Sequence, residues 1–233
     1  QMADQIQDLI QKVYEVTIRK KEAELKALQA QINPHFLYNT LDIAYWTAKM
    51  ERASQTSEMI DSLSQFFRHA LIMDDDFTTV GNEIEHLRYY IILKRQGKTS
   101  FDFELDYEEE TLGCRVVKLV LQPLVENAIL HGISGIKDGK VEVNIFRDGE
   151  TLKYEVKDNG AGIDVDDMNQ LLEHVETNNR GLGIKNMNDR IRLACGDGYG
   201  LSFYNREGKG AVITVTQPFK PAVQTCSDTG RGI

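Results

Sequence analysis

The spacing of apolar residues changes part-way along the chain, and this change most restricts the possible folds. Up to about residue 96 the apolar residues recur every three or four positions, which is typical of amphipathic helices. Residues 101–107 and several later segments alternate between apolar and polar, which is typical of half-buried strands. We therefore expect an α+β chain, in which a helical N-terminal part precedes an α/β sandwich.

The helical part is interpreted as two helices that fold back on each other. The first carries a coiled-coil seam over residues 6–23, which passes to a second apolar stripe on a shifted face after Lys20. Pro34 lies inside this pattern and removes a backbone donor, so we expect a kink or a break next to His35. A second amphipathic helix follows residues 52–54, and a second copy would cover the apolar face of this hairpin in a dimeric four-helix bundle. The large apolar residues of that face are Leu28, Ile32, Met59, Leu63 and Phe66.

The acidic turn Asp74–Asp76 marks the expected boundary between the two parts. Beyond it the pattern indicates one more helix over 82–96 and then strands joined by turns such as Asp148-Gly149, a tight hairpin signal. Helices over about 115–132 and 183–195 would cover one face of an antiparallel-rich sheet. The expected strands include residues 101–107, 141–145, 152–156, 201–203 and 212–214.

Composition excludes some classes of protein. Hydrophobic residues make up 41% of the chain and charged residues 27%, values that are ordinary for a folded domain. The net charge of -9 argues against a nucleic-acid-binding surface, which requires clustered Lys and Arg. Widely spaced Cys114, Cys195 and Cys226 indicate reduced thiols rather than a disulfide framework or a metal site. No apolar run approaches the ~18–20 residues of a membrane span, but the helical pattern is already under way at Gln1, so we expect a piece of a longer protein.

Three segments of the C-terminal part carry residue types suited to a nucleotide. Asn127 and His131 lie one helical turn apart, and an Asn amide oxygen can ligate Mg²⁺ together with substrate phosphates. Asp158-Asn159-Gly160-Ala161-Gly162 follows a strand, where the carboxylate can accept from an exocyclic amine and the glycines let the backbone approach a flat base. Gly181-Leu182-Gly183 precedes a helix, where free backbone amides attract phosphate. Each segment alone is weak evidence, and the second alone is more simply a turn, but the three in this order indicate a nucleotide site.

A histidine motif lies in the N-terminal part. The stretch Gln31–Leu41 reads QINPHFLYNTL and contains His35. An imidazole nitrogen is nucleophilic at neutral pH because its unperturbed pKa lies near ~6.5, so His35 can attack an in-line γ-phosphate. The next residue is Phe36 rather than an acid, and Asn39, one turn on, can orient the ring without accepting its proton. The histidines without such a setting, interpreted as structural or exposed, are His69, His86 and His174.

These motifs resemble those of the LytS/YesM-like sensor histidine kinases, whose phosphoacceptor motif reads much like QINPHFLYNTL. The downstream segments resemble the N, G1 and G2 boxes of the GHKL ATPases, whose nucleotide-binding architecture is called the Bergerat fold. The likeness to the G2 region continues through Asn186 and Arg190, and the resemblance covers nearly the whole chain.

The resemblance implies a role for each candidate residue. His35 would be the catalytic histidine that takes the phosphoryl group. Asn127 would hold the metal in a nucleotide site that also includes His131, and Asp158 would recognise the adenine amino group. Residues 164–180 would form a mobile lid. The residues that would give the base room or cap the triphosphate are Gly160, Gly162, Gly181, Leu182 and Gly183.

The resemblance also implies the function. The chain would be the cytoplasmic catalytic core of a two-component sensor histidine kinase, which phosphorylates His35 from ATP and Mg²⁺ and passes the phosphoryl group to an aspartate of a response regulator. Residues 1–75 would form the coiled coil and the phosphoacceptor hairpin of a homodimer, 76–221 the ATP-binding domain, and 222–233 a disordered tail. The parent protein would be anchored in the plasma membrane, with this part on its cytoplasmic side.

Two departures from the family pattern and two alternative functions stay open. Many relatives have a basic residue where this chain has Leu130 and a threonine where it has Ala211, so a phosphate contact and a hydroxyl near the adenine are missing. One alternative is a non-catalytic, nucleotide-binding dimeric signalling scaffold. The other is a GHKL-type ATPase, which would need a Glu one helical turn before Asn127, where this chain has Pro123.

Overall fold

A computed structural model describes residues 34–71, 76–96, 101–173, 182–207 and 209–221. The chain forms two compact units with the boundary between Ser64 and Gln65. Among the described residues, no helix is both long enough and apolar enough to cross a membrane.

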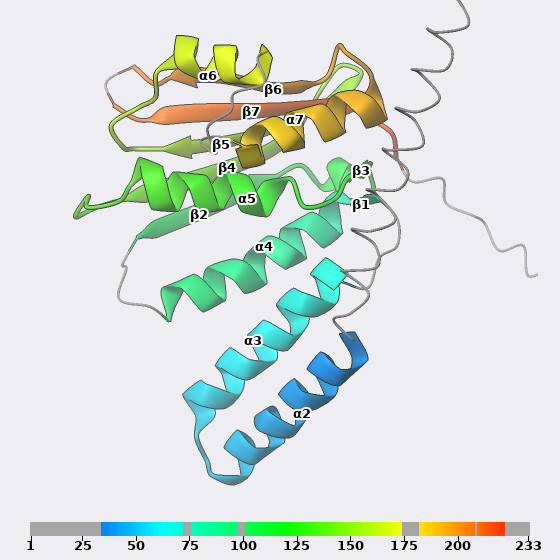
Figure 1. Ribbon diagram of the computed structural model, residues 1–233, viewed down its shortest axis with the longest axis vertical. Coiled ribbons are helices and arrows are strands. Elements are labelled where there is room, and N and C mark those ends of the chain that lie inside the picture. The colour runs from blue at the N-terminus through cyan, green and yellow to red at the C-terminus, as the bar shows by residue number, and fades with distance from the viewer. Residues whose placement is uncertain (1–33, 72–75, 97–100, 174–181, 208, 222–233) are drawn as a thin grey trace, which may run out of the picture. The chain divides into compact units, whose positions relative to one another are not determined.

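The N-terminal described residues form a helical hairpin, as expected, whose second helix runs past the unit boundary. Helices α2 (Pro34–Met50) and α3 (Ser54–Leu71) are joined by a tight turn (Figure 1). Arg52 in this turn has φ 57°, and its N–H donates to the carbonyl of Lys49 (3.1 Å). A left-handed residue just past the last helical turn satisfies carbonyls that the helix leaves unpaired, and it stops the helix there.

The second unit is built on a five-stranded sheet with the strand order β2-β4-β5-β7-β6 (Figure 1). Strands β2 and β4 are parallel and every other neighbouring pair is antiparallel, which confirms the expected antiparallel-rich sheet. The β4–β5 hairpin turns through Gly149 at φ 60°, as the Asp148-Gly149 pair predicts. The strands are β2 (Asp102–Tyr107), β4 (Lys140–Asp148), β5 (Thr151–Asp158), β6 (Gly200–Asn205) and β7 (Ala211–Pro218).

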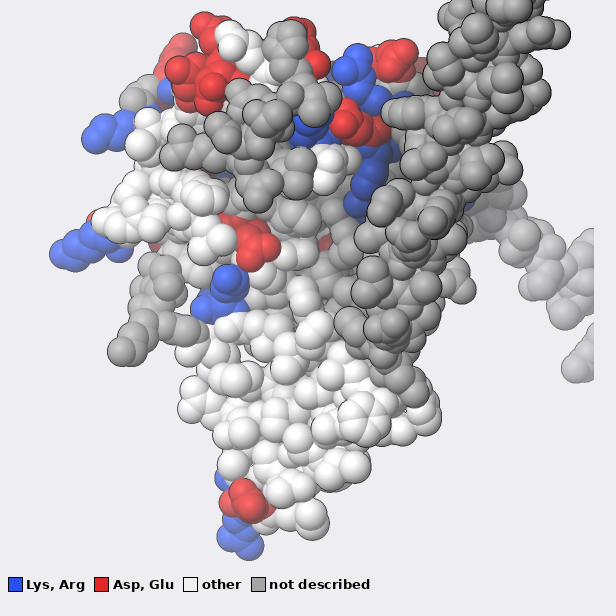
Figure 2. Space-filling view, in the orientation of Figure 1, with Lys and Arg blue, Asp and Glu red and all other residues white. Residues whose placement is uncertain are grey.

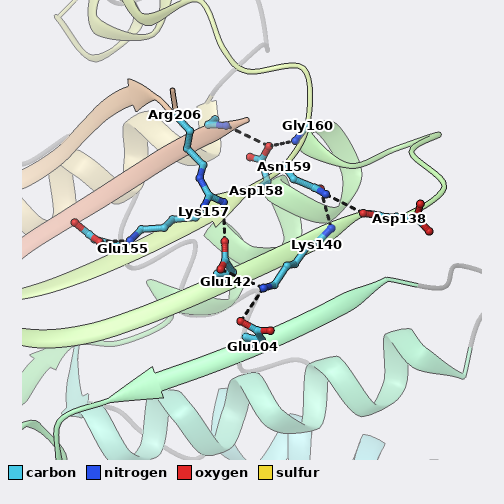
Figure 3. Close-up of polar contacts among 11 residues, drawn as sticks. Glu104, Asp138, Lys140, Glu142, Glu155, Lys157, Asp158, Asn159, Gly160 and Arg206 are labelled. Carbon is cyan, nitrogen blue, oxygen red and sulfur yellow. Dashed lines mark hydrogen bonds and ion pairs between the residues drawn. The ribbon is translucent and has the colours of Figure 1, made fainter. Parts of the chain in front are cut away.

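Three helices lie over one side of this sheet: α4 (Val80–Arg95), α5 (Leu121–Asn127) and α7 (Leu182–Cys195) (Figure 1). They share one hydrophobic core with the strands, because alternate residues of β4 and β5 are buried toward the helices. The core includes Leu87, Leu124, Val143, Tyr154, Val156 and Ile191. The other side of the sheet carries charged residues, including Glu104, Lys140, Glu142, Glu155 and Lys157 (Figure 3).

The helix expected over 115–132 is wrong at the N-terminal end of that range. Residues 115–117 form strand β3 (Arg115–Val117), antiparallel to β1 (Phe77–Thr79). The β-branched pair Val116 and Val117 is buried on this strand, where such side chains pack well. The helix begins only at Leu121, and its C-terminal continuation is the π-helix η2 (Ala128–Gly132).

Phe66 also departs from the expectation that it lies on the dimer face of the hairpin. It belongs to the second unit and stacks on His86 of α4, with ring centroids 4.5 Å apart and an interplanar angle of 18°. His86 is buried, in agreement with its interpretation as a structural histidine. The seam over 6–23, any kink before His35, residues 72–75 of the acidic turn, and Cys226 with the rest of 222–233 lie outside the described residues.

Candidate nucleotide and phosphoacceptor sites

Asp158, the last residue of β5, is the buried carboxylate of the candidate nucleotide site. Its side chain is 5% exposed. Oδ1 accepts hydrogen bonds from the backbone N–H groups of Gly160 (2.8 Å) and Ala211 (3.3 Å) (Figure 3). Because two backbone donors hold Oδ1, the carboxylate has a fixed orientation, with Oδ2 toward Gly132. A fixed acceptor of this kind is suited to recognise a single donor on a ligand.

Glycines surround Asp158 because there is no room for side chains. A Cβ on Gly132 would lie 2.7 Å from Cγ of Asp158, and a Cβ on Gly160 would collide with the carbonyl of Gly132. Gly210 has φ 105°, and a Cβ there would collide with the carbonyl of Asp158. The helix end, the turn after β5 and the β6–β7 turn therefore approach one another closely around Asp158, at positions where only glycine fits.

Asn159 connects the turn after β5 to the start of β4 by hydrogen bonds of its side chain. Its Oδ1 accepts from the N–H of Lys140 (2.8 Å) and its Nδ2 donates to the carbonyl of Asp138 (2.8 Å) (Figure 3). The regular pairing of β4 and β5 ends with Asp158 opposite Val141, so the side chain of Asn159 continues the connection where the ladder stops. The position of Asp158 is thereby fixed from its C-terminal side.

Residue 162 must also be a glycine because of its backbone conformation. It has φ 84°, and a Cβ there would lie 2.8 Å from Oδ1 of Asn205. Asn205, at the end of β6, accepts from the N–H of Ile163 (2.8 Å) and donates to its carbonyl (2.8 Å). The sequence indicated Gly162 but not Asn205, because a polar residue at a strand end gives no signal of a partner more than 40 residues away.

Asn127 ends α5 with a half-buried side chain, and the helical segment continues as η2. The N–H of Ile133 bonds the carbonyl of Ala128 (2.9 Å), a five-residue turn of the kind that is frequent at functional sites. His131 on η2 is exposed, and Gly132 ends η2 against the β5 carboxylate. One continuous helical segment thus carries the expected metal ligand and reaches the expected adenine-binding residue.

The residues fit Mg²⁺ only if a nucleotide completes its ligands. In the described ranges, no three His, Cys, Asp or Glu side chains gather in a way that would hold a metal. Mg²⁺ takes oxygen ligands, keeps several waters and is usually bound through one or two protein groups and substrate phosphates. The amide oxygen of Asn127 suits that chemistry as a single protein ligand.

Helix α7 begins at the third candidate segment. Leu182 is its first residue, and a Cβ on Gly183 would meet no atom within 4 Å. The first N–H groups of a helix have no partners within it, so this end can bind an anion. Gly181 lies outside the described residues.

The segment expected to be a lid is in part a helix. Residues 165–173 form α6 (Val165–Glu173), and residues 174–180 lie outside the described residues. Asp164 starts this helix, since its Oδ1 accepts from the N–H of Asp167 (3.0 Å). Acidic side chains gather over α6 in Figure 2.

The candidate phosphoacceptor, His35, lies in the first turn of α2 and is exposed. Nδ2 of Asn39 lies 3.3 Å from Nδ1 and 3.4 Å from Nε2 of His35, as the spacing of one turn predicts. An amide N–H can donate only to the unprotonated ring nitrogen. Asn39 thus limits the rotation of the imidazole on the helix surface.

Comparison with known proteins shows which family both parts of the chain resemble. The sequence model described as "Histidine kinase" matches residues 23–98, and the one described as "Histidine kinase-, DNA gyrase B-, and HSP90-like ATPase" matches residues 115–221. The sensor histidine kinase YesM of Bacillus subtilis is 36% identical over 224 residues, which are 95% of this chain. The chain belongs to the sensor histidine kinase family.

Other relatives and solved structures extend this result. The sensor histidine kinase BtsS of Escherichia coli is 33% identical over 85% of the chain, and the sensor protein LytS of Oceanobacillus iheyensis is 30% identical over 86%. The chain spans only 38% of YesM, 34% of BtsS and 35% of LytS. The catalytic domain of the histidine kinase ThkA matches 63% of the chain and all of that domain, with a TM-score of 0.52 at 22% identity. The chain therefore has the fold of a histidine kinase catalytic domain, preceded by the part that the histidine kinase model matches.

The two departures from the family pattern lie at the site. Leu130 is exposed on η2, where it offers no charge to a phosphate. Ala211 is buried beside Asp158 and contacts the carboxylate through its backbone N–H rather than through a side-chain hydroxyl. The orientation of Asp158 thus does not depend on the missing threonine.

The residues in and near α5 are the ones that a GHKL-type ATPase would need for its base. Pro123 stands one turn before Asn127 and supplies no carboxylate. The neighbouring Glu126 accepts from Nε2 of Gln122 (3.0 Å) and lies 4.0 Å from Nζ of Lys94. Its carboxylate is therefore engaged with α4 and with its own helix, which does not suit a base that activates water.

Proposed function

We propose that this chain is the catalytic core of an ATP-dependent protein-histidine kinase that phosphorylates His35. Membership of the sensor histidine kinase family supports the reaction type. The observation that carries the proposal is the buried, backbone-held carboxylate of Asp158 in one unit together with an exposed imidazole in the other. Sequence alone indicated both residues, and the burial and hydrogen bonds of Asp158 and the exposure of His35 support the proposal.

Each part of the nucleotide has a proposed partner. Oδ2 of Asp158 accepts from the adenine amino group, and Gly160 and Gly162 leave room for the base. Asn127 ligates Mg²⁺, with His131 beside it on the same helical segment. The N-terminal end of α7, with Gly181, Leu182 and Gly183, binds the triphosphate. Bound Mg²⁺ supplies positive charge that offsets the charge on the phosphate oxygens.

The chemical step transfers a phosphoryl group from the bridging oxygen of ATP to a ring nitrogen of His35. The unprotonated ring nitrogen of His35 forms a bond to the γ-phosphorus, while the bond from that phosphorus to the bridging oxygen breaks and ADP leaves. The remaining ring proton is released to solvent. Asn39 restrains the ring, and the phosphoramidate then passes its phosphoryl group to an aspartate of a response regulator.

A homodimer formed through the hairpin is part of the proposal. Four large apolar side chains of α2 are between 62% and 76% exposed: Phe36, Ile43, Trp46 and Met50. Phe36, Ile43 and Met50 repeat every seven residues, the spacing of a helix–helix seam. The visible face of α2 and α3 in Figure 2 carries few charges, which favours a second copy as its cover. The parent protein is proposed to be anchored in the plasma membrane, with this core on the cytoplasmic side.

Incubation with ATP labelled on the γ-phosphate and Mg²⁺ tests the proposal. The wild type should acquire an acid-labile, alkali-stable label, because a phosphoramidate is hydrolysed in acid but a phosphoester is not. His35→Gln should acquire none and should still bind ATP. Label that survives acid, or unchanged labelling of His35→Gln, would refute the assignment. ATP binding without any label in the wild type would favour the signalling scaffold.

A further inference from the structure

The N-terminal end of α5 is capped by a carboxylate from another helix. Glu83 of α4 is buried, and its Oε1 accepts from the N–H of Leu119 (2.6 Å) while its Oε2 accepts from Val120 (2.9 Å) and Leu121 (3.0 Å). A helix start leaves such N–H groups without intrahelical partners, and Val120 at the N-cap position makes no side-chain hydrogen bond. Glu83 therefore takes the place of a local cap.

The same turn is held from its carbonyl side by α7. Nη2 of Arg190 donates to the carbonyl of Lys118 (2.9 Å). Burial, the largest effect, raises the pKa of Glu83 above its ordinary value, while the three backbone donors and the positive charge of Arg190 act in the opposite direction. Glu83 of α4 thus accepts from three N–H groups of residues 118–121, and Arg190 of α7 donates to one of their carbonyls. These contacts are called the clamp below.

The backbone of this turn requires such support. Leu119 has φ 55°, a left-handed conformation that is unfavourable for a residue with a side chain. Each buried N–H left without an acceptor is a further cost to the folded state. Because Glu83 satisfies three of these donors, its loss would let the turn relax to another conformation and move the start of α5.

We propose that Glu83 and Arg190 are positioning residues for the bound Mg²⁺–triphosphate. This inference rests on the proposed function. Helix α5 has seven residues and ends at Asn127, and α7 begins at the segment proposed to bind phosphate. The clamp at 118–121 joins these two helices, so it fixes the metal ligand relative to the phosphate-binding helix end. The carboxylate of Glu83 also occupies the positive, N-terminal end of α5. The N-terminal end of α7 is then the helix end that is available to phosphate.

Glu83→Gln tests the clamp, and Glu85→Gln is the matched control. The first keeps the size of the side chain but removes its charge and one acceptor, while Glu85 is half exposed on the same helix. Without nucleotide, hydrogen exchange at the amides of 119–121 should be roughly tenfold faster in Glu83→Gln, with the β4 and β5 amides unchanged. The Mg²⁺ concentration for half-maximal ATP binding should rise by roughly tenfold, at unchanged binding stoichiometry.

The outcomes separate a positioning role from a structural one. A purely structural defect would lower the fraction of molecules that bind, with the Mg²⁺ dependence of the remainder unchanged, and would overturn the proposal. Arg190→Met should shift the Mg²⁺ dependence in the same direction, and it replaces Glu83→Gln as the test if that variant does not fold. The double variant should add little to either single change, because both act on one turn. Failure of the wild type to bind ATP would instead refute the proposed function, and the positioning role with it.

Discussion

Gly132 lies so close to the side chain of Asp158 that only glycine fits at residue 132. A Cβ at residue 132 would lie 2.7 Å from Cγ and 2.8 Å from Oδ2 of Asp158. The end of the helical segment that carries Asn127 therefore rests directly on the carboxylate that is proposed to read the adenine. The exact placement of the acceptor oxygen depends on the absence of one methyl group.

Gly132→Ala should weaken ATP binding. The added methyl group must displace the carboxylate, and overpacking of this kind costs roughly 1–3 kcal/mol, which corresponds to roughly 5- to 150-fold in the dissociation constant. Calorimetric titration with ATP measures the change. Gly113→Ala is the control, since a Cβ there meets nothing within 4 Å. Equal affinity of the two variants would show that Oδ2 of Asp158 does not contact the base.

Asn39→Ala should slow phosphorylation without a change in ATP affinity. The amide restrains the His35 ring by one exposed hydrogen bond, worth about 0.5–1.5 kcal/mol, so the initial labelling rate should fall by roughly 2- to 10-fold. Single-turnover labelling at saturating ATP gives this rate. Thr40→Ala serves as the control because its hydroxyl bonds only the carbonyl of Phe36 (2.8 Å). An unaltered rate in Asn39→Ala would remove this residue from the reaction.

Stability should fall in mild acid because of His86. Burial, the largest effect, and the charge of the nearby His69 lower the pKa of His86 from 6.5 to about 4, while Gln122 and the backbone of Phe66 act in the opposite direction. The unfolded chain therefore binds a proton between these pH values that the folded chain does not, so folding stability decreases as pH falls through this window. The loss is up to about 1.4 kcal/mol per pH unit.

Urea unfolding of the wild type and of His86→Phe, at several pH values from 7 down to about 4, checks the sign. Phenylalanine retains the stack on Phe66 and cannot take a proton, so its stability should decline less steeply. The two proteins have the same carboxylates, so the difference between the two curves reports on His86 and on its interaction with His69. Parallel curves would mean that His86 is not responsible.

Ile43→Asp should weaken the proposed homodimer. Ile43 is 69% exposed in the apolar stripe of α2, and a buried unpaired carboxylate at a helix–helix seam costs several kcal/mol. Sedimentation velocity over a concentration series should show a dissociation constant raised by at least about 100-fold. Lys49→Glu, exposed and off the stripe, should dimerise as the wild type does. A monomeric wild type at tens of micromolar would contradict the bundle.

The sequence by itself determined the order of modules and the type of most elements, and it indicated the candidate site residues. Helical and strand periodicities are local, and motifs such as Asp158-Asn159-Gly160 and the QINPHFLYNTL stretch combine neighbouring residues whose chemistry can be judged without a fold. The sequence failed at 115–117, where the β-branched pair Val116 and Val117 forms a strand whose partner, β1, lies almost 40 residues upstream.

Only the tertiary structure decided what surrounds those residues. Glu83 interrupts the apolar face of α4, and nothing local indicates that it caps a helix that starts 38 residues later. The need for glycine at residue 132 and for the side chain of Asn205 likewise arises from strands and turns that are distant along the chain. The physical cause is the same in each case: a buried polar group or a missing Cβ is explained by the atoms packed against it, and the fold brings those atoms from remote positions in the sequence.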